Sequence, residues 1–429
     1  MLRTRNCVLC TETQVDIIMP RHTWIIFTLV LTPAILMAGD WPQILGPTRS
    51  GTAQDEELLG KWLEDGPKEI WSVKIGSGYA GPIIKGDKVI QFHRLEDQEV
   101  LSCFDVTNGK EVWTHKTKAY YRGGVNADLG PRATPLIADD AVVSFGAAGD
   151  MTCVSLTDGK QRWLRNLSTD YEATDGYFGA GSSPIAIDGR VLVNIGGRKA
   201  GIVALDLKTG ETVWAKTEEK ASYSSPTLMK YGKKTIVVFI TRLNCVALDP
   251  VDGQVVFSIP FGKTGPTVNA AAPLVFESQL FISSSYGVGA KLLALTSAGK
   301  MVERWSNDES MSSQYSTCVH KDGFLYGTHG REDFANGVMR CVDVKTGEVA
   351  WQGSTGVAHT ILAGDKMIML TSDGTLFLAK VNSEEYEQLS EVQISTNSTR
   401  AIPALSNGRL FLRDNRAQSG TLTAYQVGK

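Results

Sequence analysis

The chain has 429 residues, of which 42% are hydrophobic and 21% are charged, and its formal net charge is −3. This near-neutral balance gives no reason to expect nucleic-acid binding, which requires a strongly basic surface. The length allows one large all-β domain or two to three ordinary domains, and 43 glycines indicate many tight turns.

The N-terminal region predicts a secretory signal peptide over residues 19–38. A short basic start leads into an apolar run over residues 24–37, and Ala38 supplies a small residue at the cleavage position. This is the layout of an export signal, so we expect a periplasmic or secreted protein without a membrane span in the mature chain. Residues 1–18 are interpreted as an extension ahead of the true start, and their single Cys-x-x-Cys leaves half of a metal site as the alternative.

After a lead-in segment over residues 39–68, two short motifs recur through residues 69–429. The first combines a small residue, Asp, Gly and Trp, and its copies begin at residues 103, 153, 204 and 341, with looser copies at 247 and 294. The second places a small residue, usually before Pro, ahead of an apolar run, and its eight copies begin at residues 81, 134, 183, 225, 272, 317, 359 and 402. Repetition at this spacing indicates a repeat architecture.

Each repeat predicts four short antiparallel strands. Turns ending in glycine join the third and fourth strands because glycine tolerates positive φ. Such a unit cannot bury its faces alone, whereas radial repetition buries them, so we predict an all-β, eight-bladed β-propeller of four-stranded antiparallel blades. The chain ends after the third strand of the last unit, over residues 422–425, and the N-terminal strand over residues 69–73 is expected to complete that C-terminal blade and close the ring.

The repeat resembles the pyrroloquinoline-quinone-like (PQQ-like) repeat. That repeat is shared by quinoprotein alcohol dehydrogenases and by the propeller lipoprotein of the outer-membrane barrel-assembly machinery. The lead-in over residues 40–51, with its Trp-Pro-Gln and Gly-Pro-x-Arg-x-Gly, is similar to the opening of a secreted group of such proteins. The resemblance covers residues 40–429 and is specific for architecture rather than for activity.

The resemblance implies a structural role for the recurring aromatic residues. In this family the repeat tryptophan docks between neighbouring blades, which assigns blade docking to Trp71, Trp113, Trp163, Trp214, Phe257, Trp305 and Trp351. Four of the five cysteines after residue 38 lie at or near the small position of the same motif. Equivalent positions of different blades are too far apart for a disulfide, so we expect buried thiols.

A quinoprotein dehydrogenase is the enzymatic alternative that the resemblance implies. Such enzymes typically floor the quinone with a tryptophan, often roof it with a disulfide between adjacent cysteines, and bind Ca²⁺ through carboxylate and amide oxygens. The sequence has no Cys-Cys pair, no Cys-x-x-Cys-His and no EF-hand loop, and only Trp41 and Trp62 of the lead-in remain as candidates for the floor. We therefore predict no catalytic residue, no metal and no cofactor, with PQQ and calcium as the alternative.

The predicted connections differ between the two faces of the ring. The connections between blades, and those between second and third strands, share one face and are rich in tyrosine and arginine, which are common in binding hot spots. We predict that this loop-rich face, around the mouth of the central channel, binds a partner protein or a small anionic or sugar-like ligand. The alternative is that the loops plug the channel and the arginines pair with local carboxylates. The candidates are Tyr121, Arg122, Asn126, Asp175, Tyr177, Phe178, Arg198, Arg242, Asn269, Tyr286, Gln314, His329, Arg331, His359 and Arg400.

The sequence thus predicts a monomeric, extracytoplasmic propeller that serves as a protein- or ligand-binding scaffold without catalysis, its partner being an envelope or secreted protein. Two alternatives stay open. One is a quinoprotein dehydrogenase with an atypical cofactor site. The other is a component of a cell-envelope machine that assembles outer-membrane proteins.

Overall fold

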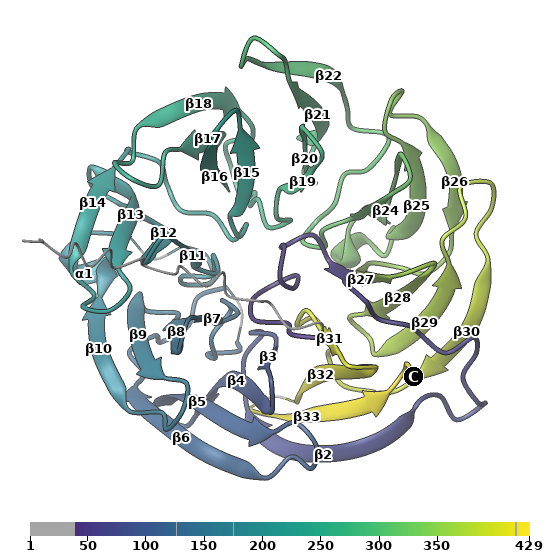
Figure 1. Cartoon of the computed structure of the whole chain (residues 1–429), viewed down its shortest axis with the longest axis horizontal. Coiled ribbons are helices and arrows are strands. Elements are labelled where there is room, and N and C mark those ends of the chain that lie inside the picture. Colours follow the sequence, from purple (N-terminus) through teal and green to yellow (C-terminus); the bar gives the residue numbers. More distant parts are fainter. Residues whose placement is uncertain (1–38, 126, 175, 417) are drawn as a thin grey trace, which may run out of the picture. The chain divides into compact units, whose positions relative to one another are not determined.

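The computed structural model describes residues 39–429 apart from residues 126, 175 and 417. In this part of the chain, eight β-sheets stand around a central axis (Figure 1). The predicted all-β, eight-bladed propeller is confirmed. The predicted extension over residues 1–18 and the predicted signal peptide over residues 19–38 lie outside the described residues. No helix of the described residues is long and apolar enough to cross a membrane.

Consecutive strands build each blade, and the first strand lies nearest the axis. Blade 1 holds β3 (Ile83–Lys85), β4 (Lys88–Leu95), β5 (Gln98–Asp105) and β6 (Glu111–Lys118); blade 2 holds β7 (Leu136–Ala138), β8 (Ala141–Phe145), β9 (Asp150–Ser155) and β10 (Gln161–Asn166). Blade 3 holds β11 (Ile185–Ile187), β12 (Arg190–Gly197), β13 (Ala200–Asp206) and β14 (Thr212–Lys216); blade 4 holds β15 (Thr227–Tyr231), β16 (Lys234–Ile240), β17 (Asn244–Leu248) and β18 (Val255–Pro260).

The second half of the ring follows the same plan. Blade 5 holds β19 (Leu274–Phe276), β20 (Gln279–Ser284), β21 (Gly289–Leu295) and β22 (Met301–Asn307); blade 6 holds β23 (Val319–Lys321), β24 (Phe324–His329), β25 (Val338–Asp343) and β26 (Val349–Gly353). Blade 7 holds β27 (Ala358–Ala363), β28 (Lys366–Thr371), β29 (Thr375–Lys380) and β30 (Gln388–Gln393); blade 8 holds β31 (Ala404–Ser406), β32 (Arg409–Arg416) and β33 (Ser419–Gln426). Two short helices lie in loops: α1 (Leu167–Asp170) and η1 (Glu332–Phe334).

The ring closes through the N-terminal strand, as predicted. Strand β2 (Lys68–Gly76) pairs antiparallel with β33 and becomes the outermost strand of blade 8, with Trp71 opposite Ala424. Figure 1 shows β2 and β33 side by side in this blade. The last repeat therefore obtains its fourth strand from the start of the ring.

The repeat glycine and the repeat tryptophan occur together because they meet between blades. In blade 3 the Oδ1 atom of Asp206 accepts hydrogen bonds from the backbone of Lys208 and Thr209, each at 2.9 Å, and Gly210 follows with φ +73°. A Cβ at Gly210 would lie 2.7 Å from the ring of Trp163 in blade 2. Glycine is thus required both for the turn and for the close approach of the neighbouring indole.

Six tryptophans lie at the same place in their blades. Each donates its indole N–H to a backbone carbonyl of the next blade over 2.7–3.1 Å, the acceptors being Val106, Leu156, Leu207, Pro250, Val344 and Asn382 for Trp71, Trp113, Trp163, Trp214, Trp305 and Trp351. Phe257 in blade 4 differs. It is half-buried, nothing lies within 4 Å of a Cβ built on Gly299 in the facing turn, and the hydroxyl of Tyr231 bonds the Gly299 carbonyl instead. Blades 4 and 5 are joined by a different contact.

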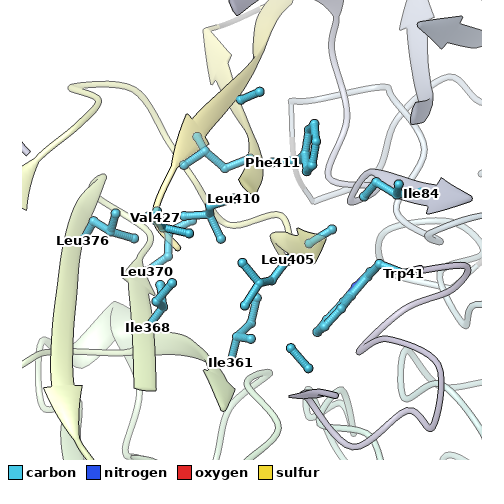
Figure 2. Packing of buried hydrophobic residues seen from close by; sticks show 14 of the residues in the cluster. Trp41, Ile84, Ile361, Ile368, Leu370, Leu376, Leu405, Leu410, Phe411 and Val427 are labelled. Atoms are coloured by element: carbon cyan, nitrogen blue, oxygen red, sulfur yellow. The ribbon is translucent and has the colours of Figure 1, made fainter. Parts of the chain in front are cut away.

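The lead-in segment is built into the ring. Strand β1 (Thr52–Ala53) pairs parallel with β27 as a fifth strand on the inner edge of blade 7, and Trp41 pairs with Ile84 of blade 1. Figure 2 shows Trp41 with Leu405 and Ile361 in one apolar cluster that spans blades 1, 7 and 8. The segment therefore covers the seam where the ring closes.

Arg49 fixes the lead-in to the opposite side of the channel. Its side chain is 2% exposed and donates to the carbonyls of Pro226 (2.8 Å) and Pro184, which precede the inner strands of blades 4 and 3, and to Oε1 of Gln43 (2.8 Å). Burial lowers the pKa of this guanidinium to about 9, which leaves it charged at neutral pH. The lead-in thus crosses the channel and links blades 3 and 4 to blades 7, 8 and 1.

Replacement of Arg49 by alanine is expected to lower the free energy of unfolding by about 2–4 kcal/mol, because two buried carbonyls lose their charged donors while part of the desolvation cost of the cation is recovered. Urea unfolding measures the loss. Arg304→Ala, at an exposed position on β22, is the control and should change stability by less than ~0.5 kcal/mol. Equal values for the two variants would contradict the linking role of Arg49.

The five cysteines of the described residues are buried, unpaired thiols. Burial raises the pKa of Cys103 and of Cys245 to about 12 each, so these thiols stay protonated and unreactive. They act as small apolar residues inside the blades.

Glu99 on β5 is a buried carboxyl group between blades 1 and 2. It is 3% exposed, and its Oε1 accepts the backbone N–H of Ala147 at 3.0 Å. Burial raises the pKa of Glu99 to about 7; Asp150 raises it further, and the Ala147 N–H, Arg94 and Arg132 lower it. The folded protein therefore binds a proton here that the unfolded chain releases near pH 4.5.

Because the folded pKa lies above the unfolded value, the stabilisation from this proton is complete below about pH 4.5 and is lost as the pH rises through about 7. Glu99→Gln keeps the acceptor for Ala147 and removes the charge. The variant should exceed the native protein in stability by up to about 3 kcal/mol at about pH 8, and the two should agree at about pH 4. Urea unfolding at both pH values tests this, and a difference independent of pH would refute it.

Candidate functional site

A cavity of about 230 Å³ lies on the axis of the ring, at the loop-rich face. Every blade contributes to its wall, and Ile44 and Leu45 of the lead-in contribute as well, so the segment that crosses the channel closes it below the cavity. The wall comprises Tyr79, Arg132, Thr134, Phe178, Gly181, Ser183, Tyr223, Ser225, Val268, Ala270, Ala272, Tyr286, Gln314, Tyr315, Thr317, His359, Arg400 and Ile402. We call this space the axial cavity.

On one side of the axial cavity, Arg400 is held by a carboxylate. Its Nη2 donates to Oε2 of Glu332 at 2.6 Å, and the same carboxylate accepts the hydroxyls of Tyr315 and Ser372, each at 2.8 Å. The guanidinium also lies over the ring of Tyr315, 5.4 Å from its centre, and burial raises the pKa of that phenol above its usual range. This arginine is therefore charge-compensated and rigid.

On another side, Arg132 is compensated in the same way. Its Nη1 lies 3.5 Å from Oδ1 of Asp128, its Nη2 donates to the Asp128 carbonyl at 2.5 Å, and its guanidinium lies over the rings of Tyr79 and Tyr121 at 5.6 and 5.4 Å. Both cationic side chains of the cavity wall are thus paired with a carboxylate. The wall carries no surplus positive charge.

His359 contributes an acceptor to the axial cavity. It lies at the start of β27 and is 5% exposed, and its Nε2 lies 2.8 Å from the carbonyl of Arg400, so this nitrogen carries the proton. Burial lowers the pKa of His359 to about 4, and the ring is neutral at pH 7. The lone pair of Nδ1 then has no hydrogen-bond partner among the described residues.

A second cavity, of about 350 Å³, lies beside the first and shares Gly181, Tyr223 and Val268 with it. Tyr177 and Arg242 line it. The rings of Tyr177, Phe178 and Tyr223 follow one another at 6.5 and 5.5 Å, which connects the exposed surface to the wall of the axial cavity. The two cavities form one hollowed area.

The residues predicted for the binding face lie in several different environments. Phe178, Tyr286, Gln314, His359 and Arg400 line the axial cavity, and Tyr177 and Arg242 line the second cavity. Tyr121 is buried against Arg132, while Arg122 and Arg198 lie exposed on the loops. Arg331 pairs with Asp333 and lies over the rings of Tyr286 and Phe334. Asn126 and Asp175 lie outside the described residues.

Two predicted residues serve the framework instead. The side-chain amide of the buried Asn269 donates to the Thr241 carbonyl at 2.8 Å, and Nδ1 of His329 accepts the backbone N–H of Ser312 at 3.1 Å. The side-chain amide of Asn269 and the Nδ1 atom of His329 thus hold loops in place, and neither residue lines the axial cavity. The alternative that arginines pair locally also holds for Arg132, Arg331 and Arg400.

The prediction did not include Tyr79, Arg132 or the two lead-in residues Ile44 and Leu45, which all line the axial cavity. A signal for the wall was present in the repeats. The residue that begins the second motif lines the cavity in seven blades: Thr134, Ser183, Ser225, Ala272, Thr317, His359 and Ile402. Six of these positions lie two residues before the first strand of their blade, and His359 is the second residue of β27, so they converge on the axis.

The axial cavity offers no cradle for a calcium-dependent quinone. Among the described residues that line it there is no carboxylate, cysteine or tryptophan, and Ca²⁺ requires a set of oxygen ligands that usually includes carboxylates. Trp41 is buried in the seam cluster, and Trp62 is buried beside blade 7, where its backbone N–H bonds the hydroxyl of Ser390. Among the described residues, no group of three or more His, Cys, Asp or Glu side chains is placed to hold a metal ion.

Comparison with known proteins gives a consistent family signal. A family model described as outer membrane protein assembly factor BamB matches residues 50–180 and 96–353. The chain is 24% identical over 357 residues to the outer membrane protein assembly factor BamB of Burkholderia pseudomallei (strain K96243), covering 72% of this chain and 87% of the relative. It is 20% identical over 375 residues to the outer membrane protein assembly factor BamB of Yersinia pestis, covering 72% of this chain and 88% of the relative.

Solved structures show the same fold. The crystal structure of BamB from Moraxella catarrhalis superposes with a TM-score of 0.60 at 17% identity, covering 84% of this chain and 97% of the other. A europium-containing methanol dehydrogenase superposes with a TM-score of 0.70 at 10% identity, covering 91% of this chain and 98% of the other. The quinohemoprotein alcohol dehydrogenase of Comamonas testosteroni superposes with a TM-score of 0.64 at 14% identity, covering 91% of this chain and 81% of the other. At these identities the likeness extends to the fold alone.

Proposed function

The chain belongs to the family of the outer membrane protein assembly factor BamB, and we propose that it acts outside the cytoplasm as a non-catalytic scaffold in the assembly of outer-membrane proteins. The observation that carries the proposal is the family match over residues 50–180 and 96–353. Both curated relatives carry the name of an assembly factor, and the matches span most of their length. The assembly alternative is therefore favoured over a scaffold of unspecified purpose, and the predicted export signal is consistent with it.

The loop-rich face offers a surface for a polypeptide partner. Tyr120, Val125 and Tyr177 are 55%, 75% and 46% exposed and come from the loops that follow blades 1 and 2. The backbone N–H of Val125 donates to the Tyr177 carbonyl at 3.1 Å, so the two loops support one another. Exposed apolar side chains beside a hollowed, arginine-bearing surface are typical of protein interfaces. We call Tyr120, Val125 and Tyr177 the loop patch.

Site-specific photocrosslinking in the native envelope tests this function. A photoreactive amino acid at Tyr177 is expected to crosslink a component of the outer-membrane assembly machinery, identified by mass spectrometry. The same amino acid at Val251, an exposed residue on the turn between β17 and β18 of the opposite face, is the matched control and should give no such product. Equal products from both faces, or products only with proteins unrelated to assembly, would contradict the proposal.

The quinoprotein alternative is tested separately. The described residues of the cavity wall include no carboxylate, and Arg132 and Arg400 are already paired. We therefore expect added PQQ and Ca²⁺ to give neither saturable quenching of tryptophan fluorescence nor reduction of an artificial dye with simple alcohols. Tight, saturable binding with dye turnover would replace the scaffold by an oxidoreductase. The crosslinking result does not depend on this measurement.

A further inference from the structure

Two residues of the axial cavity's wall each carry a buried polar atom that has no hydrogen-bond partner among the described residues. The Nδ1 of His359 is an acceptor without a donor, and the Nε of Arg400 is a donor without an acceptor among the described residues. Both residues line the cavity, and they are linked to each other by the bond from His359 Nε2 to the Arg400 carbonyl. A buried polar atom without a partner is costly, so a site that keeps two of them in a cavity is suited to a ligand that satisfies both.

A row of hydroxyl groups adds further donors. Thr134, Ser183 and Ser225 follow one another along the wall, and each hydroxyl oxygen accepts a backbone N–H from the preceding blade. Gly81 donates to Thr134 at 3.1 Å, Thr134 donates to Ser183 at 2.9 Å, and Ser183 donates to Ser225 at 3.0 Å. Thr317 accepts the N–H of Ala272 at 2.9 Å in the same way. Because a backbone N–H already occupies a lone pair of each oxygen, the hydroxyl hydrogens remain as donors, and no acceptor for them occurs among the bonds of the described residues.

Most of the remaining wall consists of aromatic and aliphatic side chains. The aromatic side chains Tyr79, Phe178, Tyr223, Tyr286 and Tyr315 stand around the cavity, and Leu45, Val268 and Ala270 complete it. Both guanidinium groups are paired with carboxylates, so a bound anion would find no uncompensated cation. The wall is therefore matched to a neutral ligand with apolar faces and a polar edge.

The size of the cavity narrows the ligand further. A volume of about 230 Å³ is below the range of roughly 300–1,000 Å³ that is usual for drug-sized ligands, and it suits one ring with its substituents. An aromatic side chain has the right faces but brings at most one polar atom, which would leave most of the hydroxyl donors and either His359 or Arg400 unsatisfied. A pyranose ring has two apolar faces and a rim of hydroxyls, each both donor and acceptor.

We propose that the axial cavity is a binding site for a neutral, monosaccharide-sized sugar, held between aromatic side chains with its hydroxyls on Thr134, Ser183, Ser225, Thr317, Arg400 and His359. This activity goes beyond the assembly function. It uses the axial cavity and not the loop patch.

Direct binding measurements test the proposal. The purified protein is titrated with D-glucose, D-galactose, D-mannose and N-acetyl-D-glucosamine up to roughly 10 mM, in the range of weak specific binding, by calorimetry and saturation-transfer NMR. At least one neutral sugar is expected to bind saturably. Absence of binding by all four overturns the proposal, as does tighter binding of D-glucuronate or of indole, which represent an anionic sugar and an aromatic side chain.

Two variants locate the site. Ala270→Trp places a large side chain in the cavity without removing a hydrogen-bonding group, and it should weaken sugar binding at least about tenfold, whereas Val251→Trp on the opposite face should leave it unchanged. His359→Phe removes the Nδ1 acceptor and should weaken binding about three- to tenfold. Unchanged binding in Ala270→Trp would overturn the assignment to this cavity.

The same variants separate this proposal from the assembly function. Ala270→Trp is expected to retain the crosslink from Tyr177, because the loop patch lies outside the axial cavity. In the native protein, absence of the crosslink together with saturable sugar binding would contradict the assembly proposal alone, and absence of sugar binding with an intact crosslink would contradict the sugar proposal alone. Urea unfolding of Ala270→Trp and His359→Phe shows whether each variant is folded under the conditions of the titrations.

Discussion

A chain that begins at Ser77 is expected to lose the cooperatively folded ring. It lacks β2, so β33 loses its antiparallel partner along the whole register from Lys68–Gln426 to Gly76–Ser419. It also lacks Trp71, whose indole donates to the Val106 carbonyl of blade 1 at 3.1 Å, and Trp41, which is 1% exposed in the seam cluster. The open edge and the uncovered apolar seam should produce aggregation or an expanded monomer, measured by size-exclusion chromatography and near-UV circular dichroism.

A circular permutation provides the matched control. Strand β2 runs antiparallel to β33, and Lys68 lies opposite Gln426, so residues 68–76 can follow Lys429 through a short linker. This variant restores the fourth strand of blade 8 and Trp71 but still lacks residues 39–67. It should fold as a monomer and be less stable than the native protein, because β1, Trp41 and Arg49 remain absent. If the chain that begins at Ser77 unfolded cooperatively and with native-like stability, the claim that β2 closes the ring would be refuted.

Trp214→Ala is expected to lower the free energy of unfolding by about 3–5 kcal/mol, which is the usual cost of truncating a buried aromatic side chain. The Trp214 indole donates to the Pro250 carbonyl at 3.0 Å, and a Cβ at Gly253 would lie 2.7 Å from its ring, so the side chain fills the space between blades 3 and 4. Alanine leaves a cavity that the rigid sheets cannot close, and the carbonyl loses its donor. Urea or thermal unfolding measures the change.

Two substitutions distinguish docking from a general effect of mutation. Val213→Ala alters the neighbouring residue on β14, whose side chain is 42% exposed, and should cost less than ~1 kcal/mol. Trp214→Phe keeps an aromatic ring and should fall between the two, since blade 4 carries Phe257 at the equivalent position. A cost for Trp214→Ala no greater than that for Val213→Ala would show that the indole does not hold the blades together.

The charges around the axial cavity decide which ligands are compatible with it. The number of arginines on the loop-rich face suggests a site for an anion. The contacts do not favour one, because Asp128 and Glu332 already neutralise Arg132 and Arg400. The polar capacity that remains consists of hydroxyl hydrogens, one guanidinium N–H and one imidazole lone pair. Such a set favours a hydroxylated neutral ring over a carboxylate.

Some of the site was accessible from the repeats and some was not. The strand order of each blade places the connections between blades, and those between second and third strands, on one face of the ring. Residues on these connections could therefore be predicted, namely Phe178, Tyr286, Gln314, His359 and Arg400. Glu332 was missed because it lies 68 residues from Arg400 in the sequence and reaches it from a different blade. Asn269 and His329 were predicted as binding residues, yet each bonds a nearby backbone group, a choice that depends on loop conformation.

The sequence by itself determined the number of blades, the order of strands in each blade and the closure of the ring. These properties follow from local patterns, since a Pro, an apolar run, an Asp-x-x-x-Gly turn and a Trp recur every 42 to 53 residues and the last copy lacks only its fourth strand. The tertiary structure alone decided the course of the lead-in. Arg49 reaches carbonyls 135 and 177 residues away, Thr52 pairs with Leu362, and Leu45 floors the axial cavity. Residues 40–53 carry no copy of the repeat, and their place is fixed by the shape and unpaired carbonyls of a channel that exists only once eight blades have assembled.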